Sequence, residues 1–218
     1  GHIVRTLELP RTHARARADF RFPYAREMSN FEARDRRDYP EPGGVVCIGS
    51  SSMRMWKTIH EDLAPLPIVH RGFGGAWIRH VLEYADRIVV PYEPAEILVY
   101  AGENDIAGGV SVERVVEDTR AFFVKAHSEL PKTRIYYMSM KPSPSRRHLW
   151  SDFKRGNERI RDMCESLEYV DYIDIATPML GEDGQPKADI FLPDRLHMNE
   201  NGYTIWTRIV RDALIGED

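Results

Sequence analysis

The sequence predicts an α/β fold in which helices cover both faces of a five-stranded parallel sheet. Short apolar runs rich in Val, Ile and Tyr are followed by segments with helical periodicity, and the runs lack the strict polar alternation of half-exposed strands. The chain has 218 residues, which suits one α/β domain with a well-buried core better than two domains. We therefore expect a single domain with an N-terminal extension.

The predicted strands are five apolar runs, each followed by a helix-like segment or by the last part of the chain. They are Val45–Ile48, Ile68–Val69, Ile97–Tyr100, Ile135–Met140 and Tyr169–Ile175. Runs that are apolar throughout fit strands whose two faces are both buried, as in parallel sheets.

The predicted helices are Ala76–Val90, Val112–Leu130, Trp150–Leu167 and Asn199–Leu214. In the second, apolar side chains recur at roughly helical spacing and Ser111 stands where an N-cap is expected, so its apolar stripe faces the core. Loops rich in Pro and Gly separate these elements, as turns require.

We expect residues 1–43 to form an extension that packs on the domain of residues 44–218. The extension carries apolar side chains that need a surface to bury against, either as a structural strap or as one wall of a cleft. They are Phe20, Phe22, Tyr24, Met28 and Phe31. The basic stretch between residues 5 and 26 is interrupted by Asp19, which favours a solvated surface over a nucleic-acid-binding arm.

Composition excludes several classes of function. The net charge of −4 gives no long-range attraction to nucleic acid or to anionic membranes, and no apolar run is long enough to cross a bilayer. The two cysteines, Cys47 and Cys164, are expected to be buried thiols, and the histidines lack metal-ligand spacing, so we expect neither a metal nor a cofactor. No signal-peptide pattern is present, which leaves the cytoplasm and export after removal of a leader both open.

Four polar segments stand where a parallel sheet places its ligands, beyond the carboxyl ends of strands. Residues 49–53 read Gly-Ser-Ser-Ser-Met, residues 71–75 read Arg-Gly-Phe-Gly-Gly, and residues 102–105 read Gly-Glu-Asn-Asp. Residues 194–197, before the last predicted helix, read Asp-Arg-Leu-His. A serine, a histidine and a carboxylate are the groups that nucleophilic acyl transfer needs, because the imidazole takes the serine proton and the carboxylate orients the imidazole.

In order and position these segments resemble the four signature blocks of the SGNH/GDSL hydrolase superfamily, from Val45 to Leu214. The resemblance implies a flavodoxin-like three-layer α/β/α sandwich and a hydrolase that acts on carboxylic esters. It also implies a nucleophile at Ser51, a general base at His197 and its carboxylate partner at Asp194. The oxyanion hole would be formed by the backbone amides of Ser51 and Gly75 and the side chain of Asn104.

The first block departs from the family pattern, which usually reads Gly-Asp-Ser. Here Ser50 stands in place of the Asp and is followed by two more serines, so the nucleophile can be Ser51 or Ser52. Counting from Gly49 without a gap favours Ser51, and Ser52 is the alternative.

Each segment also has a simpler interpretation when it is taken alone. The serines could cap a helix or bind a phosphate, and Asp194 and His197 could be a surface pair. We expect Asp105 to be structural. Arg71 and Arg195 flank the blocks and could contact an anionic or hydroxylated substrate or serve ordinary structural roles.

The expected function is that of an esterase that removes an acetyl or other short acyl group from a small-molecule or carbohydrate ester through an acyl-enzyme, since nothing in the sequence indicates an interfacial apolar lid. Three alternatives remain open: an O-acyltransferase or a thioesterase with the same triad, and a non-catalytic carbohydrate-binding module.

Overall fold

The computed structural model describes residues 23–216, and the chain divides into two units, Gly1–Asp38 and Tyr39–Asp218. The described part of the first unit contains helix α1 (Ala25–Asp35). Phe20, Phe22 and most of the basic stretch lie outside the described residues. The packing of the extension on the domain stays a prediction.

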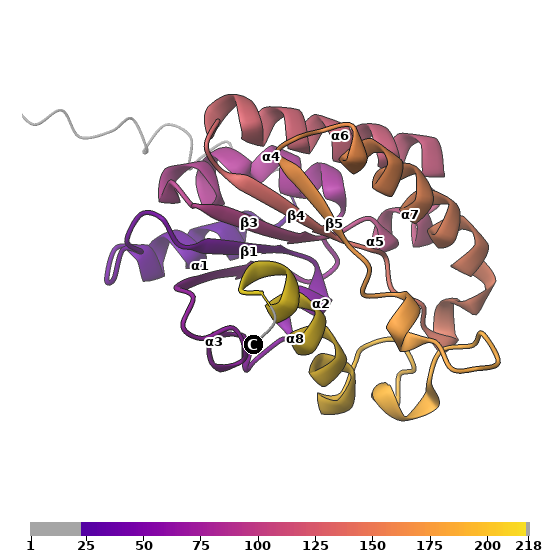
Figure 1. The fold of residues 1–218 in the computed structure, drawn as a ribbon. Helices are drawn as coiled ribbons and strands as arrows, with labels where there is room; N and C mark the ends of the chain where they lie inside the picture. The colour runs from indigo at the N-terminus through magenta and orange to yellow at the C-terminus, as the bar shows by residue number, and fades with distance from the viewer. Residues whose placement is uncertain (1–22, 217–218) are drawn as a thin grey trace, which may run out of the picture. The chain divides into compact units, whose positions relative to one another are not determined.

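The second unit contains the predicted parallel sheet. Its strands are β1 (Val45–Gly49), β2 (Ile68–Gly72), β3 (Glu96–Tyr100), β4 (Arg134–Met138) and β5 (Val170–Ile173). They are all parallel and lie in the order β2-β1-β3-β4-β5 (Figure 1). This is the flavodoxin-like order, in which the switch point between β1 and β3 is the usual place for a ligand, so the predicted fold class is confirmed.

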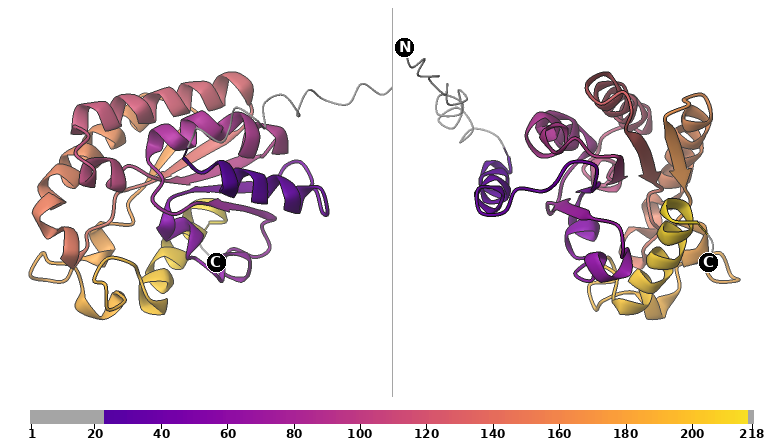
Figure 2. Two further views of the ribbon diagram at one scale, coloured as in Figure 1. Left: turned by 180° about the vertical axis from the view of Figure 1, so that it is seen from behind. Right: turned by 60° about the vertical axis from the view of Figure 1, so that its left-hand side comes forward.

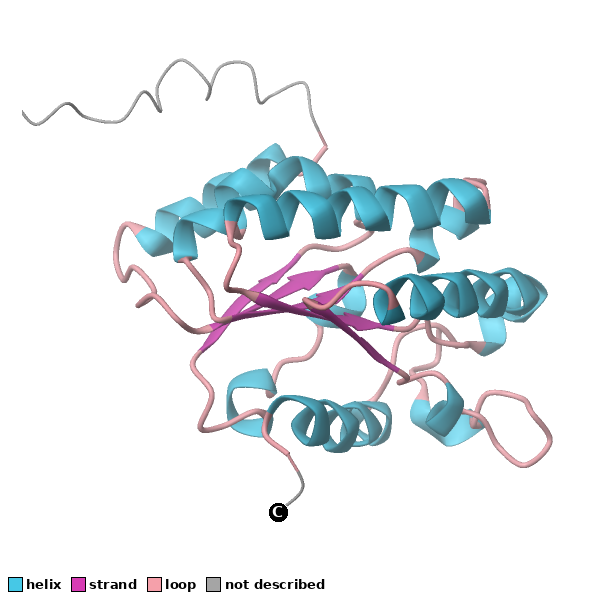
Figure 3. Ribbon diagram, turned by 45° about the horizontal axis from the view of Figure 1, so that its top comes forward, coloured by secondary structure: helices cyan, strands magenta, loops and turns pink. Residues whose placement is uncertain are grey.

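Helices cover both faces of the sheet (Figure 3). Helices α4 (Ile78–Ile88), α6 (Val112–Glu129) and α7 (Trp150–Glu165) pack side by side on one face. The opposite face is covered by α3 (Ile59–Asp62) and α8 (Glu200–Leu214), and the view from behind in Figure 2 shows α8 across the sheet from α4 and α6. Every helix within residues 23–216 is too short or too polar to cross a membrane.

Apolar side chains on both faces of the strands explain the three layers. On the α8 side, Tyr100 and Trp56 pack around Trp206, with ring centroids 4.9 and 5.9 Å from the Trp206 centroid. Ser111 Oγ accepts the Arg114 amide at 3.2 Å, which confirms the predicted N-cap. Both cysteines are buried thiols, as predicted.

Several elements differ from the prediction near the carboxyl edge of the sheet: β2 extends to Gly72 rather than Val69, and β5 ends at Ile173 rather than Ile175. Strand β4 ends at Met138 rather than Met140, because the backbone of Met140 pairs with the side chain of Asn157: its amide donates to Oδ1 at 2.8 Å and its carbonyl accepts from Nδ2 at 3.0 Å. Helix α4 begins at Ile78 rather than Ala76, because Gly75 makes a turn with φ of +78°. The early end of β4 and the late start of α4 lengthen the loops at this edge.

Candidate active site

The ends of β1, β2 and β3 are held together at the carboxyl edge. The Phe73 amide donates to the Gly49 carbonyl at 2.9 Å, and the Ser50 amide donates to the Tyr100 carbonyl at 3.0 Å. Gly49 has a φ of +153°, and a Cβ there would lie 2.0 Å from the Tyr100 carbonyl oxygen, so only glycine fits. The segments that follow the three strands therefore leave the sheet side by side.

Ser51 begins the short helix α2 (Ser51–Arg54) and is partly exposed. Its Oγ lies 3.0 Å from His197 Nε2, although the two residues are 146 positions apart. Ser50 and Ser52 are buried, with 4% and 3% of their surfaces exposed. The Tyr203 hydroxyl donates to the Ser52 carbonyl at 2.7 Å and so ties α2 to α8.

Asp194 fixes the ring of His197 from the other side. The carboxylate Oδ2 lies 2.5 Å from His197 Nδ1, while Oδ1 accepts the backbone amides of Leu196 and His197, each at 3.0 Å. Arg195 closes this turn with a φ of +59°. With Nδ1 bonded to a carboxylate, Nδ1 carries the ring proton and Nε2 can accept one from Ser51.

Asp194 is charged at neutral pH. Desolvation acts to raise the pKa of its carboxyl, but the hydrogen bonds from the His197 ring and the two amides outweigh it and lower the pKa to about 2. The structure thus brings together the three predicted triad residues in the hydrogen-bonded order that acyl transfer uses.

Gly75 and Asn104 lie at the same edge. Asn104 belongs to the short helix α5 (Glu103–Ala107), and its Nδ2 donates to the Ala76 carbonyl at 3.3 Å, next to the exposed Gly75. The Asn104 Oδ1 accepts from Arg146 Nη1 at 2.9 Å. The predicted oxyanion segments are therefore in direct contact with each other.

A buried group of charged side chains supports Asn104, and the sequence did not indicate it. Glu103 accepts from the Tyr100 hydroxyl at 2.5 Å, from Lys141 Nζ at 3.1 Å and from Arg146 Nη1 at 2.9 Å. Burial alone would raise the pKa of Glu103, but the charges of Lys141 and Arg146 hold it below its usual range. The only signal in the sequence was that Glu103 and Lys141 lie just after predicted strands. It did not predict their burial, because charged loop residues are usually exposed.

Asp105 has the structural position that the sequence predicted. Its two carboxylate oxygens accept the Ile78 amide at 3.1 and 3.2 Å, and only 1% of its surface is exposed. It thereby fixes the start of α4, just after Gly75. Desolvation raises the pKa of Asp105 to about 7, against the lowering effect of the bond from Ile78.

This pKa predicts a pH-dependent stability difference between the wild type and Asp105→Asn. Asp105 ionises near 3.8 when unfolded and near 7 when folded, so its contribution to stability is complete at acid pH and is lost as pH rises through about 7. The amide of the variant stays neutral but keeps an oxygen for Ile78. The melting temperature of the variant minus that of the wild type should therefore become more positive between pH 5 and pH 8, and a constant or opposite difference would contradict the assignment.

The two arginines of the second and fourth segments, Arg71 and Arg195, have different surroundings. Arg71 is buried and donates to the Tyr92 hydroxyl and to the His70 carbonyl, each at 3.0 Å, which favours the structural role over a substrate contact. Arg195 is exposed in the loop that carries Asp194 and His197. Within residues 23–216, no three His, Cys, Asp or Glu side chains are grouped so as to hold a metal ion.

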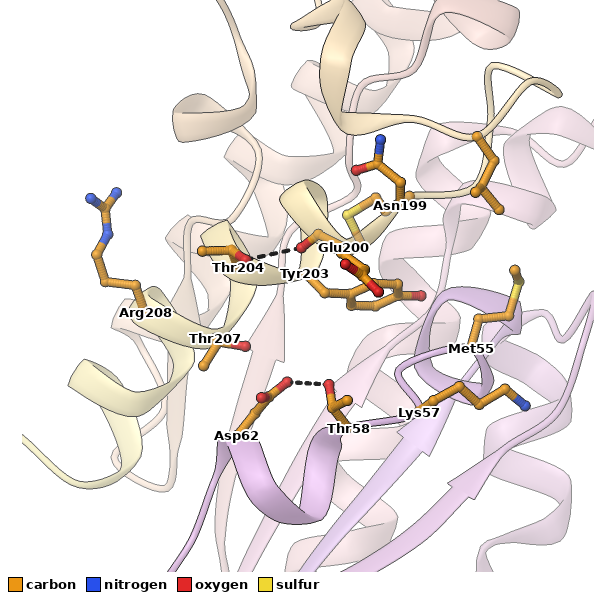
Figure 4. Close-up of a pocket in the computed structure, with 12 residues that line it drawn as sticks. Met55, Lys57, Thr58, Asp62, Asn199, Glu200, Tyr203, Thr204, Thr207 and Arg208 are labelled. Carbon is orange, nitrogen blue, oxygen red and sulfur yellow. Dashed lines mark hydrogen bonds between the residues drawn. The ribbon is translucent and has the colours of Figure 1, made fainter.

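A groove of about 800 Å³ lies between α8 and the segment 55–62 (Figure 4). Met198 and Leu192 line it beside the loop that carries Asp194 and His197, and the Leu192 amide donates to the His197 carbonyl at 2.8 Å. The rest of the wall consists mostly of polar residues and includes Thr58, which donates to Asp62 at 2.6 Å. Although most of these residues are polar, the surface that they expose to the groove is mostly apolar.

The chain is similar in sequence and in fold to known proteins. The sequence profile of the GDSL-like lipase/acylhydrolase family matches residues 45–205, whereas no curated protein matches the chain. A candidate platelet activating factor from Streptococcus pneumonia superimposes with a TM-score of 0.76 at 21% identity, covering 86% of this chain and 90% of the other. A GDSL-like lipase from Bacteroides thetaiotaomicron gives 0.72 at 20% identity, covering 85% and 97%. A variant of an acetyl-xylooligosaccharide esterase from Geobacillus stearmophilus gives 0.68 at 13% identity, covering 82% and 96%.

Proposed function

Because this chain belongs to the GDSL-like lipase/acylhydrolase family and is an ester-bond hydrolase, we propose that it removes short acyl groups from esters through a covalent intermediate on Ser51. The observation that carries the proposal is the continuous chain of contacts Ser51–His197–Asp194, with distances of 3.0 and 2.5 Å. The burial of Ser52 supports Ser51 as the nucleophile.

In the first half-reaction Ser51 Oγ attacks the ester carbonyl carbon while His197 Nε2 takes its proton. The oxygen of the tetrahedral intermediate gains negative charge, which the backbone amides of Ser51 and Gly75 and the side-chain amide of Asn104 stabilise. The C–O bond then breaks, and the alcohol leaves with the proton from His197. Asp194 stays ionised throughout and stabilises the charged imidazolium.

In the second half-reaction water replaces the alcohol. His197 takes a proton from the water as the oxygen attacks the acyl group on Ser51. Collapse of the second tetrahedral intermediate releases the carboxylic acid, and the proton returns to Ser51.

We further propose that the substrate is an acetyl or short-chain ester of a small hydroxylated alcohol. The mostly apolar surface of the groove can take the acyl group, and its Asn199, Glu200 and Arg208 side chains offer hydrogen bonds to a hydroxylated alcohol. The structural likeness to an acetyl-xylooligosaccharide esterase is in line with a carbohydrate ester.

Hydrolysis of para-nitrophenyl acetate, butyrate and octanoate tests this substrate class. We expect the acetate and butyrate to give the higher kcat/KM, with free carboxylate accounting for the released phenol even when a sugar acceptor is present. Transfer of the acetyl group to the sugar would contradict hydrolysis and indicate an acyltransferase, and a strong preference for thioesters would indicate a thioesterase.

Asn104→Ala is expected to lower kcat by about 10²- to 10³-fold, the usual effect of removing one oxyanion donor. Asn104→Asp should lose activity to a similar degree, because it keeps an oxygen towards Arg146 but has no N–H to donate. A rise in KM with unchanged kcat in both variants would show that Asn104 binds the substrate and the transition state equally, and would contradict its role as an oxyanion donor.

A further inference from the structure

Arg146 lies behind the proposed oxyanion donor, in the short 3-10 helix Pro144–Leu149 that follows β4. Its Nη1 donates both to Asn104 Oδ1 and to Glu103 Oε1, each at 2.9 Å. Only 19% of the side chain is exposed, so most of the guanidinium is shielded from water. Arg146 is therefore a partly buried cation whose one nitrogen joins a carboxylate to the side chain of Asn104.

These contacts decide which way the Asn104 amide faces. A guanidinium carries only donors, so the atom of Asn104 that faces it must be the oxygen. The Ala76 carbonyl is only an acceptor, so the atom that faces it must be the nitrogen, at 3.3 Å. Both neighbours select the same orientation, and the second hydrogen of Nδ2 remains for the substrate oxygen.

The buried side chains behind Arg146 hold the guanidinium in place. Glu103 is fixed by the Tyr100 hydroxyl and by Lys141, whose side chain is 1% exposed and whose backbone amide donates to the Tyr100 hydroxyl at 3.2 Å. The Ser145 amide also donates to the Arg195 carbonyl at 3.0 Å. The segment that carries Arg146 is therefore attached to the loop that carries the proposed general base.

We propose that Arg146 is a positioning residue that holds the Asn104 amide with its N–H towards the oxyanion. The proposal rests on the proposed function, in which Asn104 is an oxyanion donor. Of the two contacts that orient the amide, the longer one to Ala76 is all that remains without the guanidinium. A rotated amide presents Oδ1 to the developing negative charge and raises the barrier.

A double-mutant cycle tests this coupling, because a positioning residue has little left to do once the group that it positions is gone. The variants are Arg146→Met, Asn104→Ala and the combination, with Arg147→Met as a control on an exposed neighbour. Rates with para-nitrophenyl acetate are divided by the concentration of sites that react with a fluorophosphonate, so that misfolded protein does not count.

We expect Arg146→Met to lower kcat by roughly 10- to 100-fold, less than the full loss of a donor, with KM changed little. In the Asn104→Ala background the same substitution should lower kcat by no more than about threefold, and Arg147→Met should match the wild type. The proposal would be overturned if Arg146→Met had the kcat of the wild type. It would also be overturned if the substitution lowered kcat by the same factor in the wild-type and Asn104→Ala backgrounds.

Arg146→Lys keeps the test decisive if the Met variant does not fold, since it keeps a charged donor beside Glu103. Its loss of kcat should also be smaller in the Asn104→Ala background than in the wild type, and an equal loss would overturn the proposal. If the wild type is not labelled and Ser51→Ala is fully active, the proposed function fails together with this inference. If the wild type is labelled, but the substitution of Arg146 lowers kcat by the same factor in the wild-type and Asn104→Ala backgrounds, this inference alone fails.

Discussion

Ser51→Ala is expected to lower kcat/KM for para-nitrophenyl acetate by about 10⁴- to 10⁶-fold, the range in which removal of a catalytic serine usually falls. The Ser51 hydroxyl is the group that His197 Nε2 contacts, at 3.0 Å, and alanine removes it without adding volume. Steady-state kinetics on folded variants, with folding checked by thermal denaturation, measure the effect.

Ser52→Ala is the matched control for Ser51→Ala. The two serines are neighbours in α2, but Ser52 is buried and contributes its backbone carbonyl to the contact with Tyr203, which alanine keeps. Its kcat/KM should stay within about threefold of the wild type, since the substitution keeps the backbone contact with Tyr203 and leaves the Ser51 hydroxyl in place. The reverse pattern, in which Ser52→Ala is inactive and Ser51→Ala active, would move the nucleophile by one residue.

Asp194→Asn is expected to lower kcat by about 10³- to 10⁴-fold with a small change in KM. The carboxylate holds the proton on His197 Nδ1, so that Nε2 can accept one from Ser51. An amide can present its N–H to Nδ1 and select the opposite tautomer, in which Nε2 carries the proton. It also loses the charge that stabilises the imidazolium.

Asp212→Asn provides the control for charge alone, because Asp212 is an exposed carboxylate on α8. Asp212→Asn should have the kinetics of the wild type.

Since the pKa of Asp194 is about 2, the activity of the wild type should not fall through titration of this carboxyl until the pH approaches that value. Activity of Asp194→Asn within about tenfold of the wild type would contradict a role for this carboxylate in orienting His197.

The sheet could be predicted from the sequence because its strands are apolar on both faces. Val45, Ile97 and Ile135 begin runs that have no polar alternation, and helical periodicity in between leaves few other arrangements. The short helices α2 and α5 could not be predicted, because four or five residues are too few to show a helical period.

The predicted site residues lie together because each follows the carboxyl end of a strand or precedes the last helix. The supporting residues could not be predicted in the same way. Glu103 and Arg146 are 43 positions apart, and nothing in either segment indicates that the two charges meet below the surface. Lys141 directly follows a predicted strand, but it is buried in an ion pair with Glu103, which comes from another loop.

Arg71 shows that a position next to site residues in the sequence does not by itself predict a functional role. It directly precedes the glycines of the second block, yet its side chain is directed to the Tyr92 hydroxyl inside the domain. Strand residues alternate between faces, so a neighbour of a site residue in the sequence can be remote from the site in space.

Labelling with a fluorophosphonate, with the modified residue mapped by mass spectrometry, tests the central claim most directly, because the reagent reports an activated serine without any assumption about the substrate. Each label should lie on Ser51, and His197→Ala should be labelled far more slowly, since the serine then has no base. Label on Ser52, or no label on any serine of a folded wild-type protein, would contradict acyl-enzyme catalysis through Ser51.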